Sequence, residues 1–367
     1  MKNIFGNSIS VTLFGESHGE MIGAVLDGIA PGIKINKEHI DAMLTLRRPV
    51  GDISTPRCEK DEYRIVSGVY NGYTTGTPLT LLIPNLDTRS GDYDKHKALP
   101  RPSHADYTAE CKYHGYQDGR GGGHFSGRIT AALVAVGAIL SSALADKGIY
   151  IGTHISSLGG IKDRGFDKLE SDIAILSKKR FPVIDGEAAG NMMKYIRECG
   201  ESGDSVGGIL ETAVIGMPAG VGEPWFDSVE SELSHILFSV PAVKGVEFGA
   251  GFAFADMKGS EANDPFSVSD GRVITKTNHN GGINGGITNG MPIIFRTAIK
   301  PTPSISKEQT TVDLSTMTES TVTVGGRHDP AIIHRARAVI DAVTAIAIAD
   351  MLAVRYGTDL LSGGSAL

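Results

Sequence analysis

The feature of this sequence that most constrains its fold is a layout that occurs twice: a glycine cluster beside arginine and histidine residues precedes a long apolar stretch. The first glycine cluster lies at 121–123 and leads into residues 129–145, which carry no charge. The second lies at 325–326 and leads into residues 330–356. The uncharged stretch is shorter than the ~20 residues of a membrane span, so we expect a buried helix there. The repeated layout suggests two similar halves, although coincidence in a glycine-rich chain explains it equally well.

Glycine is abundant in the whole chain and accounts for 47 of its 367 residues, close to twice the usual share of about 7%. The chain has no Gly-X-Y repeat and an ordinary 16 prolines, so it is neither a collagen nor a flexible linker protein. Hydrophobic residues make up 41%, which is enough for a core. A folded chain of this kind uses glycine where the backbone takes an unusual conformation or closely approaches another group.

The charge and the cysteines exclude several classes of protein. The net charge is −7, from 35 basic and 42 acidic residues, whereas a nucleic-acid-binding protein usually has a basic balance or a basic stripe. Cys58, Cys111 and Cys199 are odd in number and far apart, which argues against a disulfide framework and against a thiolate zinc site. The N-terminal residues do not have the pattern of a secretory signal. We therefore expect a cytoplasmic protein that binds neither nucleic acid nor a membrane.

Hydrophobic periodicity predicts strands and helices with no low-complexity linker between them, so we expect one α+β domain over residues 1–367. Residues 85–112 are polar and aperiodic, and we expect a long connection there. Strands are predicted at 9–14, 21–26, 64–69, 79–83, 149–156, 209–215, 246–255 and 292–299. Helices are predicted at 36–47, 128–147, 186–198, 229–238 and 330–356.

The first candidate for chemistry is the segment Gly15-Glu16-Ser17-His18-Gly19. It matches G-x-S-x-G, the nucleophile elbow of serine hydrolases, in which the serine lies between a strand and a helix. A second strand is expected directly after this segment, so the context of an elbow is missing. The other interpretations are a tight turn between two strands, and a catalytic His18 displayed on that turn.

Histidines are concentrated between residues 96 and 128, a window that holds four of the eleven in the chain. Lysines and arginines interleave with them and would repel a metal ion, and neither H-x-x-x-H nor H-E-x-x-H occurs. No metal is therefore expected, and a solvated loop with incidental histidines remains the alternative to a catalytic segment. The four histidines are His96, His104, His114 and His124.

The glycine run at 121–123 precedes a helix and is suited to bind an anion. Free N–H groups and the partial positive charge of a helix N-terminus attract phosphate, and Arg128 can add a bidentate contact. The spacing of the glycines is similar to that of dinucleotide-binding loops, but no strand is expected before them, which disfavours a Rossmann fold. The P-loop sequence G-x-x-x-x-G-K-[ST] is absent from the chain.

Nine arginines lie near glycine, proline or histidine, which favours a small polyanionic ligand over nucleic acid. Any single one could be a surface ion pair. Asp329, beside Arg327 and His328, is a candidate base, a residue that orients a base, or the cap of the helix that follows. The nine arginines are Arg47, Arg48, Arg57, Arg101, Arg120, Arg128, Arg327, Arg335 and Arg337.

Taken together, these segments resemble the chorismate synthase family over essentially the whole chain. Any one motif alone would be weak, but many long motifs in the order that the family shows make the resemblance specific. The motifs are F-G-E-S-H-G (14–19), L-R-R-P (46–49), T-T-G-T-P (74–78), R-P-S-H-A-D (101–106), K-Y…D-G-R-G-G-G (112–123), V-K-G-V-E (243–247), N-H-N-G-G-I-N-G-G-I (278–287), K-P-T-P-S (300–304) and G-G-R-H-D-P (325–330).

The resemblance implies a single-domain β-α-β sandwich with long central helices, in a homotetramer. It implies a lyase that converts 5-enolpyruvylshikimate-3-phosphate to chorismate and phosphate by anti-1,4-elimination, in the shikimate pathway to the aromatic amino acids. The family needs reduced FMN, although the reaction has no net redox change. No separate reductase domain is visible in the sequence, so we expect an external flavin reductase or another supply of reduced flavin. The substrate has one phosphate and two carboxylates, in agreement with the arginines.

The resemblance also implies roles for individual residues. His18 would protonate the leaving phosphate, His104 would hold the reduced flavin in its working protonation state, and Asp329 would assist proton removal through the flavin N5. Substrate anions would be bound by Ser17, Arg47, Arg101, Arg128 and Arg327. The FMN would lie against His124, Phe125, Ser126, Ala242, Gly285, Lys300, Pro301, Thr302, Pro303, Ser304 and Arg327.

The chain departs from the usual family pattern at four places. His124 stands where most members have arginine, and Pro241 replaces an asparagine before Ala242, which puts that flavin contact in doubt. Residues 50–53 belong to a stretch that is one residue shorter than usual and lacks an arginine, which puts in doubt a contact to NADP described for some members. Residues 335–338 read R-A-R-A where R-A-V-P is usual.

Overall fold

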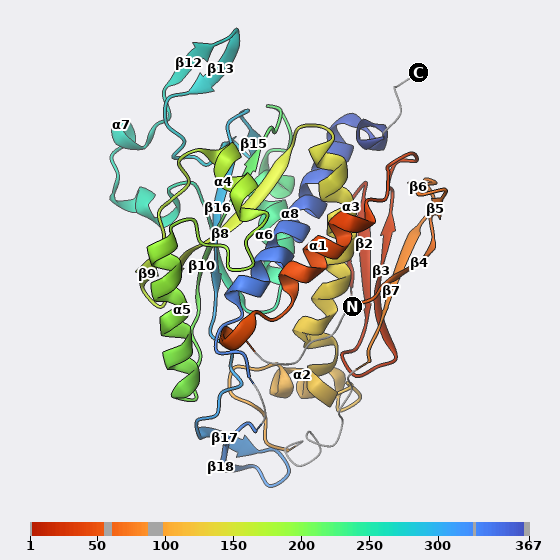
Figure 1. Cartoon of the computed structure of the whole chain (residues 1–367), viewed down its shortest axis with the longest axis vertical. Helices are drawn as coiled ribbons and strands as arrows, with labels where there is room; N and C mark the ends of the chain where they lie inside the picture. The colour runs from red at the N-terminus through yellow and green to blue at the C-terminus, as the bar shows by residue number, and fades with distance from the viewer. Residues whose placement is uncertain (1, 55–60, 87–97, 326–327, 363–367) are drawn as a thin grey trace.

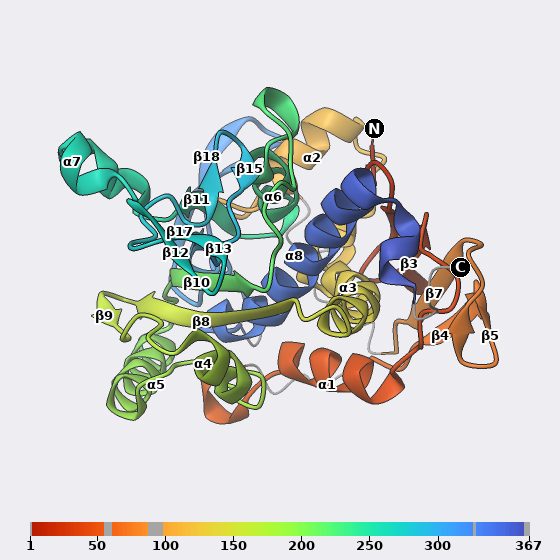
Figure 2. The same cartoon turned by 90° about the horizontal axis from the view of Figure 1, so that it is seen from above.

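The computed structural model describes residues 2–54, 61–86, 98–325 and 328–362. Two five-stranded antiparallel sheets lie on either side of a layer of helices, with α3 (Thr130–Ala145) and α8 (Ile333–Tyr356) at its centre (Figure 1). The view from above shows the two central helices between the two sheets (Figure 2). The α+β class and the sandwich around long central helices are as predicted.

The first sheet has the strand order β1-β2-β3-β7-β4. Its buried and partly exposed residues alternate in β7, where Leu79, Leu81 and Ile83 are buried, as the period of two in a strand requires. Helix α1 (Lys37–Arg47) packs against α3 and α8 and begins at Asn36, whose side chain accepts a hydrogen bond from the backbone of His39. The strands are β1 (Ile4–Phe5), β2 (Ser10–Gly15), β3 (Met21–Asp27), β7 (Leu79–Pro84) and β4 (Arg64–Ser67).

The second sheet has the strand order β11-β16-β10-β8-β9. The predicted strand at 246–255 is wrong in its bounds, because the strand ends at Phe248 and residues Gly251–Asp256 form a 3₁₀ helix. Gly249 and Gly251 take the left-handed φ values of 56° and 58°, which an extended strand does not contain. The strands are β11 (Val243–Phe248), β16 (Ile293–Ile299), β10 (Gly208–Ile215), β8 (Tyr150–Leu158) and β9 (Ile161–Lys162).

The two halves of the chain share one topology. In each half two antiparallel strands, a helix, two further strands and a long central helix follow one another, and the fourth strand pairs with the second and the third. The first half reads β2, β3, α1, β4, β7, α3, and the second reads β8, β10, α6 (Val229–Ser239), β11, β16, α8, with further helices inserted after β8. The repeated layout seen in the sequence therefore corresponds to a repeated fold.

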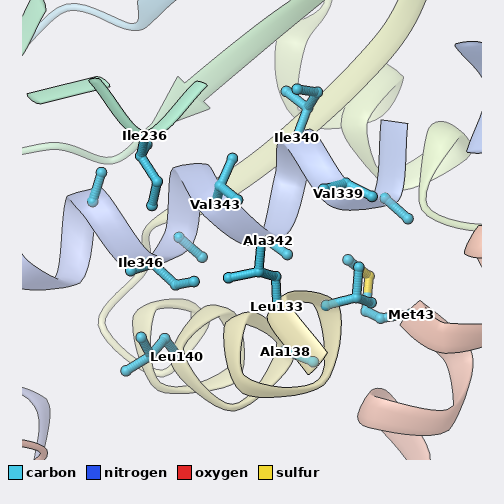
Figure 3. Packing of buried hydrophobic residues seen from close by; sticks show 14 of the residues in the cluster. Met43, Leu133, Ala138, Leu140, Ile236, Val339, Ile340, Ala342, Val343 and Ile346 are labelled. Atoms are coloured by element: carbon cyan, nitrogen blue, oxygen red, sulfur yellow. The ribbon is translucent and has the colours of Figure 1, made fainter. Parts of the chain in front are cut away.

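The central helices α3 and α8 pack against each other through buried hydrophobic side chains, among them Leu133 and Ala342 (Figure 3). A Cβ atom at Gly137 of α3 would lie only 2.6 Å from the Cβ of Ala342 in α8. Residues Gly127–Ala145 are long and apolar enough to cross a membrane, but 78% of their most apolar window is buried. This helix is a core element of the sandwich, as predicted.

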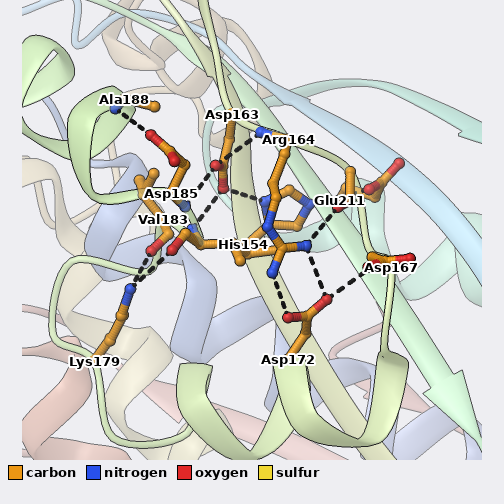
Figure 4. Close-up of polar contacts among 12 residues, drawn as sticks. His154, Asp163, Arg164, Asp167, Asp172, Lys179, Val183, Asp185, Ala188 and Glu211 are labelled. Atoms are coloured by element: carbon orange, nitrogen blue, oxygen red, sulfur yellow. Dashed lines mark hydrogen bonds and ion pairs between the residues drawn. The ribbon is translucent and has the colours of Figure 1, made fainter.

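A buried polar cluster joins the second sheet to the segments around α4 (Leu169–Leu176) and α5 (Gly186–Glu201) (Figure 4). His154 of β8 lies between Asp163 and Glu211, at 2.8 and 3.0 Å. Burial would lower the pKa of His154, but the hydrogen bonds to the two carboxylates outweigh it and raise the pKa. Asp163 also accepts hydrogen bonds from the backbone of Ile184 and Asp185, which positions the start of α5.

Shorter elements surround the sandwich. The prediction of an irregular connection at 85–112 missed α2 (Asp106–Tyr113), which is short and weakly amphipathic; residues 87–97 of that stretch lie outside the described part of the chain. The other elements are α7 (Gly259–Ala262), the hairpins β5–β6 (Val69–Tyr70, Tyr73–Thr74), β12–β13 (Phe266–Ser269, Arg272–Thr275), β14–β15 (Ile283–Asn284, Ile287–Thr288) and β17–β18 (Gln309–Asp313, Thr318–Val322), and the 3₁₀ helices Gly51–Ile53, Arg120–Phe125, Gly127–Ile129, Trp225–Asp227 and Thr358–Leu361.

Candidate active site

The segment G-x-S-x-G forms the turn of the β2–β3 hairpin. Gly15 is paired with Ile22 in the ladder, so a strand follows the turn and the nucleophile elbow of a hydrolase is excluded at this position. Ser17 and His18 are buried, and Ser17 Oγ lies 3.0 Å from His18 Nδ1. The turn therefore presents a hydroxyl and an imidazole in contact with each other.

The glycine run packs directly against this turn. Gly121, Gly122 and Gly123 all have left-handed φ values, of 60°, 93° and 52°. A Cβ at Gly121 would collide with the ring of His18, and one at Gly122 would lie 3.4 Å from His104 Cε1. The carbonyl of Gly123 accepts a hydrogen bond from the Ser17 backbone at 3.1 Å. The run thus separates His18 from His104 by bare backbone, which explains why three consecutive glycines are needed.

His104 is held by an aspartate that the sequence did not single out. Asp106 lies 2.7 Å from His104 Nδ1 and accepts two hydrogen bonds of 2.8 Å from the guanidinium of Arg101. Burial alone would raise the pKa of Asp106, but the hydrogen bonds from Arg101 and His104 outweigh it and hold that pKa well below its usual range. An ionised Asp106 makes Nδ1 the protonated nitrogen of His104 and leaves Nε2 for other contacts.

Two of the predicted substrate arginines share one buried carboxylate. Arg47 donates to Asp61 at 3.1 Å, and Arg128 donates to the other oxygen of the same carboxylate. Asp61 has a side chain only 1% exposed, and those of Arg47 and Arg128 are 9% and 8% exposed. Burial lowers the pKa of Arg47, and the neighbouring Asp61 opposes this shift. We call these three residues the Asp61 cluster.

Asp329 is connected to the Asp61 cluster through Arg335. The guanidinium of Arg335 donates to Asp329 at 2.5 Å and to the backbone carbonyl of Arg47 at 2.9 Å. Asp329 thus lies close to Arg47, an arginine of the first half of the chain. Arg327, predicted for both substrate and flavin, lies outside the described residues.

Several predicted flavin residues meet next to His104. Lys300 donates from its ammonium to the carbonyl of Ser103 at 2.5 Å, and its backbone donates to Ala242 at 2.9 Å. Burial, and then the nearby Lys244, lower the pKa of Lys300. The segment at 300–304 is fixed further by Ser205, whose hydroxyl donates to the carbonyl of Thr302 at 2.7 Å.

The other predicted flavin residues occupy different places. Nδ1 of His124 donates to the carbonyl of Gly15 at 2.7 Å, so this ring holds the His18 turn. Phe125 is 39% exposed and its ring meets Tyr113 edge to face. Gly285 lies in space next to the start of α6, because the carbonyl of the following residue, Gly286, accepts a hydrogen bond from the backbone of Val229. Ala242 follows the other end of that helix in the chain. An 11-residue helix is about 16 Å long, so Gly285 and Ala242 are well separated within one chain.

Two cavities flank these residues. One, of about 700 Å³, borders the 300–304 segment and is lined by Ile299 and Pro301. The other, of about 1140 Å³, lies between α1 and β4 and reaches Asp61. Among the described residues, no group of three or more His, Cys, Asp or Glu side chains is arranged to bind a metal ion.

Comparison with known proteins decides the family. The sequence model of "Chorismate synthase" matches residues 9–353. The chain belongs to the chorismate synthase family. It is 46% identical to the chorismate synthase of Thermococcus gammatolerans, over 95% of this chain and 96% of the relative. It is also 46% identical to that of Pyrococcus abyssi, over 97% and 99% of the two chains.

A solved structure titled "Crystal Structure of Chorismate Synthase" superimposes with a TM-score of 0.76 at 30% identity, over 96% of this chain and 94% of that one. The family resemblance and the chorismate synthase fold are thus confirmed. By family membership the chain is an enzyme of the carbon–oxygen lyase class. Its substrate is a small molecule, as in other chorismate synthases.

Sequence reasoning missed three residues that position the site: Asp61, Asn85 and Asp106 were not assigned roles, although all three contact predicted site residues. Arg335 was among the nine candidate arginines, but its contact to Asp329 was not predicted. Asp106 had a signal, since it ends the motif R-P-S-H-A-D at 101–106. Asp61 and Asn85 had none, because their partners are distant in sequence and are brought together by the sheet.

Proposed function

We propose that this chorismate synthase converts 5-enolpyruvylshikimate-3-phosphate to chorismate and phosphate by anti-1,4-elimination with reduced FMN, within the shikimate pathway to the aromatic amino acids. The observation that carries the proposal is the placement of His18 and His104 on the two sides of one glycine run, with arginines around them. Two imidazole rings on either side of a glycine backbone can transfer protons to a substrate and to a flat cofactor that bind side by side.

The residues around His104 fit a flavin. Phe125 offers an exposed aromatic ring, and Lys300 supplies a cation beside Ser103. A planar ring packs well against an aromatic side chain, and a cation suits an anionic ring or a phosphate. When bound, reduced FMN supplies the transient electron donation that no side chain provides for breaking the C–H and C–O bonds.

Each histidine has a distinct role in this proposal. His18 donates a proton to the leaving phosphate, and the hydroxyl of Ser17 at 3.0 Å orients its ring and adds a hydrogen bond to the substrate. His104 would hold the reduced flavin in its working protonation state, and the carboxylate of Asp106 orients its ring at 2.7 Å. Asp329 would assist proton removal through the flavin N5, and Arg335 holds its carboxylate at 2.5 Å.

The arginines bind the substrate's anions in competition with carboxylates of the chain. Arg101 is paired with Asp106, and Arg47 and Arg128 are paired with Asp61. Among the described residues, the guanidinium groups of Arg47, Arg128 and Arg335 meet at the carboxylates of Asp61 and Asp329. Guanidinium groups that are held in this way can form bidentate contacts to a phosphate or carboxylate of the substrate.

Further parts of the proposal concern the whole protein. We propose one domain over residues 1–367, because one continuous cluster of buried hydrophobic residues includes both sheets and the helices between them. We further propose a homotetramer, which the family resemblance implies, a cytoplasmic location, which the few scattered cysteines favour, and an external supply of reduced flavin. Arg48 is kept in the R-R-P motif, but the shortened stretch after it leaves a contact to NADP in doubt.

The decisive experiment is phosphate release from 5-enolpyruvylshikimate-3-phosphate with photoreduced FMN under anaerobic conditions. We expect turnover without net consumption of reduced flavin. Absence of release at saturating flavin would leave the rival interpretation, a module that binds anions and has lost the chemistry. Turnover under air with FMN and NADPH alone would show that the protein reduces its own flavin. Labelling of Ser17 by a fluorophosphonate would reopen the hydrolase interpretation.

A further inference from the structure

Asn85, the residue directly after β7, lies between the turn that carries His18 and the Asp61 cluster. Its side-chain nitrogen donates to the carbonyl of Glu16 at 2.9 Å and to that of Gly19 at 2.8 Å. Its side-chain oxygen accepts from Nε of Arg128 at 3.0 Å. Its backbone N–H donates to the carbonyl of Glu20 at 3.1 Å.

The two ends of this amide hold two different parts of the site. The carbonyls of Glu16 and Gly19 stand on either side of Ser17 and His18, so the donated hydrogen bonds fix the ends of the catalytic turn. The accepted hydrogen bond fixes the guanidinium of Arg128, which also donates to Asp61 and to the carbonyl of Pro84. Only a group that is donor and acceptor at once can do both, and among side chains of this size that is an amide.

We propose that Asn85 is a positioning residue that holds the His18 turn and Arg128 in one fixed relation. The substrate's phosphate must meet its proton donor while another of its anions is held by the arginines. A displacement of about 1 Å between such groups is enough to slow a reaction about 100-fold. This inference rests on the proposed function, because it assigns Asn85 to the protonation step of that reaction.

The test compares two variants of Asn85 in the full-length enzyme. Asn85→Ala removes all the side-chain hydrogen bonds, and Asn85→Asp keeps an acceptor for Arg128 but cannot donate to the two carbonyls. We expect both to lower kcat about tenfold or more, with KM changed less than kcat, since lost hydrogen bonds of about 1.4 kcal/mol correspond to a factor of ten. Asn191→Asp, the same change at an exposed position of α5, serves as the control and is expected to keep the wild-type kcat.

A double-mutant cycle with His18→Ala separates positioning from a general structural effect. If Asn85 acts through His18, then Asn85→Ala in the His18→Ala background lowers kcat by a clearly smaller factor than in the wild-type background, because one of the two groups that it positions is already absent. If the factor by which kcat falls in the double variant equals the product of the two single factors, the proposal is overturned. A wild-type kcat in Asn85→Asp would also overturn it. If Asn85→Ala does not fold, Asn85→Asp carries the same cycle.

A second readout does not depend on turnover. In the apoprotein, the ring signals of His18 in an NMR titration are expected to move in both Asn85 variants, while those of His154, buried in the second sheet, stay unchanged and report an intact fold. An unchanged His18 signal would contradict the inference. A wild-type enzyme that releases no phosphate would instead contradict the proposed function, and this NMR result would still stand on its own.

Discussion

His18 and His104 differ in what holds them, and this difference gives the first prediction at the scale of the residue. His18 has Ser17 beside it, whereas His104 is tied to an ionised carboxylate. We expect His18→Ala and His104→Ala each to lower kcat by about 100-fold or more, the usual contribution of a general acid or base. FMN binding, measured by flavin fluorescence, should persist in both. His235→Ala, at an exposed position of α6, is the control, and near-normal turnover in either site variant would refute its role.

Asp341 gives a prediction for the pH dependence of stability. This buried carboxyl of α8 has its pKa raised from 3.8 to about 6, chiefly by burial, with Arg337 opposing the shift. The folded state therefore holds this proton more tightly than the unfolded state does, so the contribution to stability is present below about pH 4 and is lost as the pH rises through 6. The loss amounts to about 3 kcal/mol at most.

The measurement compares Asp341→Asn with wild type by chemical denaturation between pH 4 and 7. His334, whose burial lowers its pKa from 6.5 to about 3, contributes the opposite slope in both proteins, since its unfolded form binds more protons. We therefore expect the stability of the variant, relative to wild type, to rise with pH over this range. Asp359→Asn, at an exposed position, should leave the pH dependence of the unfolding free energy unchanged. If the unfolding free energies of Asp341→Asn and wild type differ by the same amount at every pH, the pKa of Asp341 is not raised.

What the sequence reveals about single residues depends on how local their contacts are. His18 and Asp329 were predicted from short motifs, because the residue types that do proton chemistry lie next to glycine or proline in sequence. Asp61 and Asn85 could not be found in this way, since their partners lie up to 69 residues away and are met only through the order of the strands.

At the scale of the element, two helical glycines predict opposite effects of the same substitution. Gly137→Ala places a methyl group 2.6 Å from Ala342, so the central helices must separate, at a cost of about 1–3 kcal/mol. Gly190→Ala on α5 meets no atom within 4 Å and removes the flexibility of glycine from a helix, so a gain of about 0.5–1 kcal/mol is expected. Thermal denaturation of the two variants checks the pair, and equal signs would contradict the close packing of α3 on α8.

Helices and strands with a strong period were predicted within a few residues, whereas the exceptions have local causes. The strand at 243–248 was placed too late because two glycines with left-handed φ end it. Helices α2 and α4 were both missed, because each has only eight residues, too few to repeat a helical period, and α2 also has a weak apolar face.

At the scale of the whole molecule, the two similar halves are joined by a carboxylate. Asp350, near the end of α8, is buried and accepts hydrogen bonds from the backbones of Asn7, Ser8 and Ile9, at 2.7 to 2.9 Å. The last helix of the second half thereby fixes the entry to β2, the strand that precedes the His18 turn. The repeated topology was visible in sequence only as a repeated layout of glycines, because the strand order depends on pairing between distant segments.

This contact allows a test of the proposal that the chain is one domain. Asp350→Ala removes the acceptor of three backbone N–H groups, of which only that of Ile9 is buried, so we expect a cost of about 1–3 kcal/mol, the range for one buried unsatisfied group. If the two halves unfold as one unit, hydrogen exchange should speed up equally in β3 of the first sheet and in β10 of the second. Asp359→Asn, beyond the end of α8 and exposed, is the matched control. Faster exchange confined to the first sheet would show that each half is a separate cooperative unit, because the broken contact would then weaken only the sheet that contains β2.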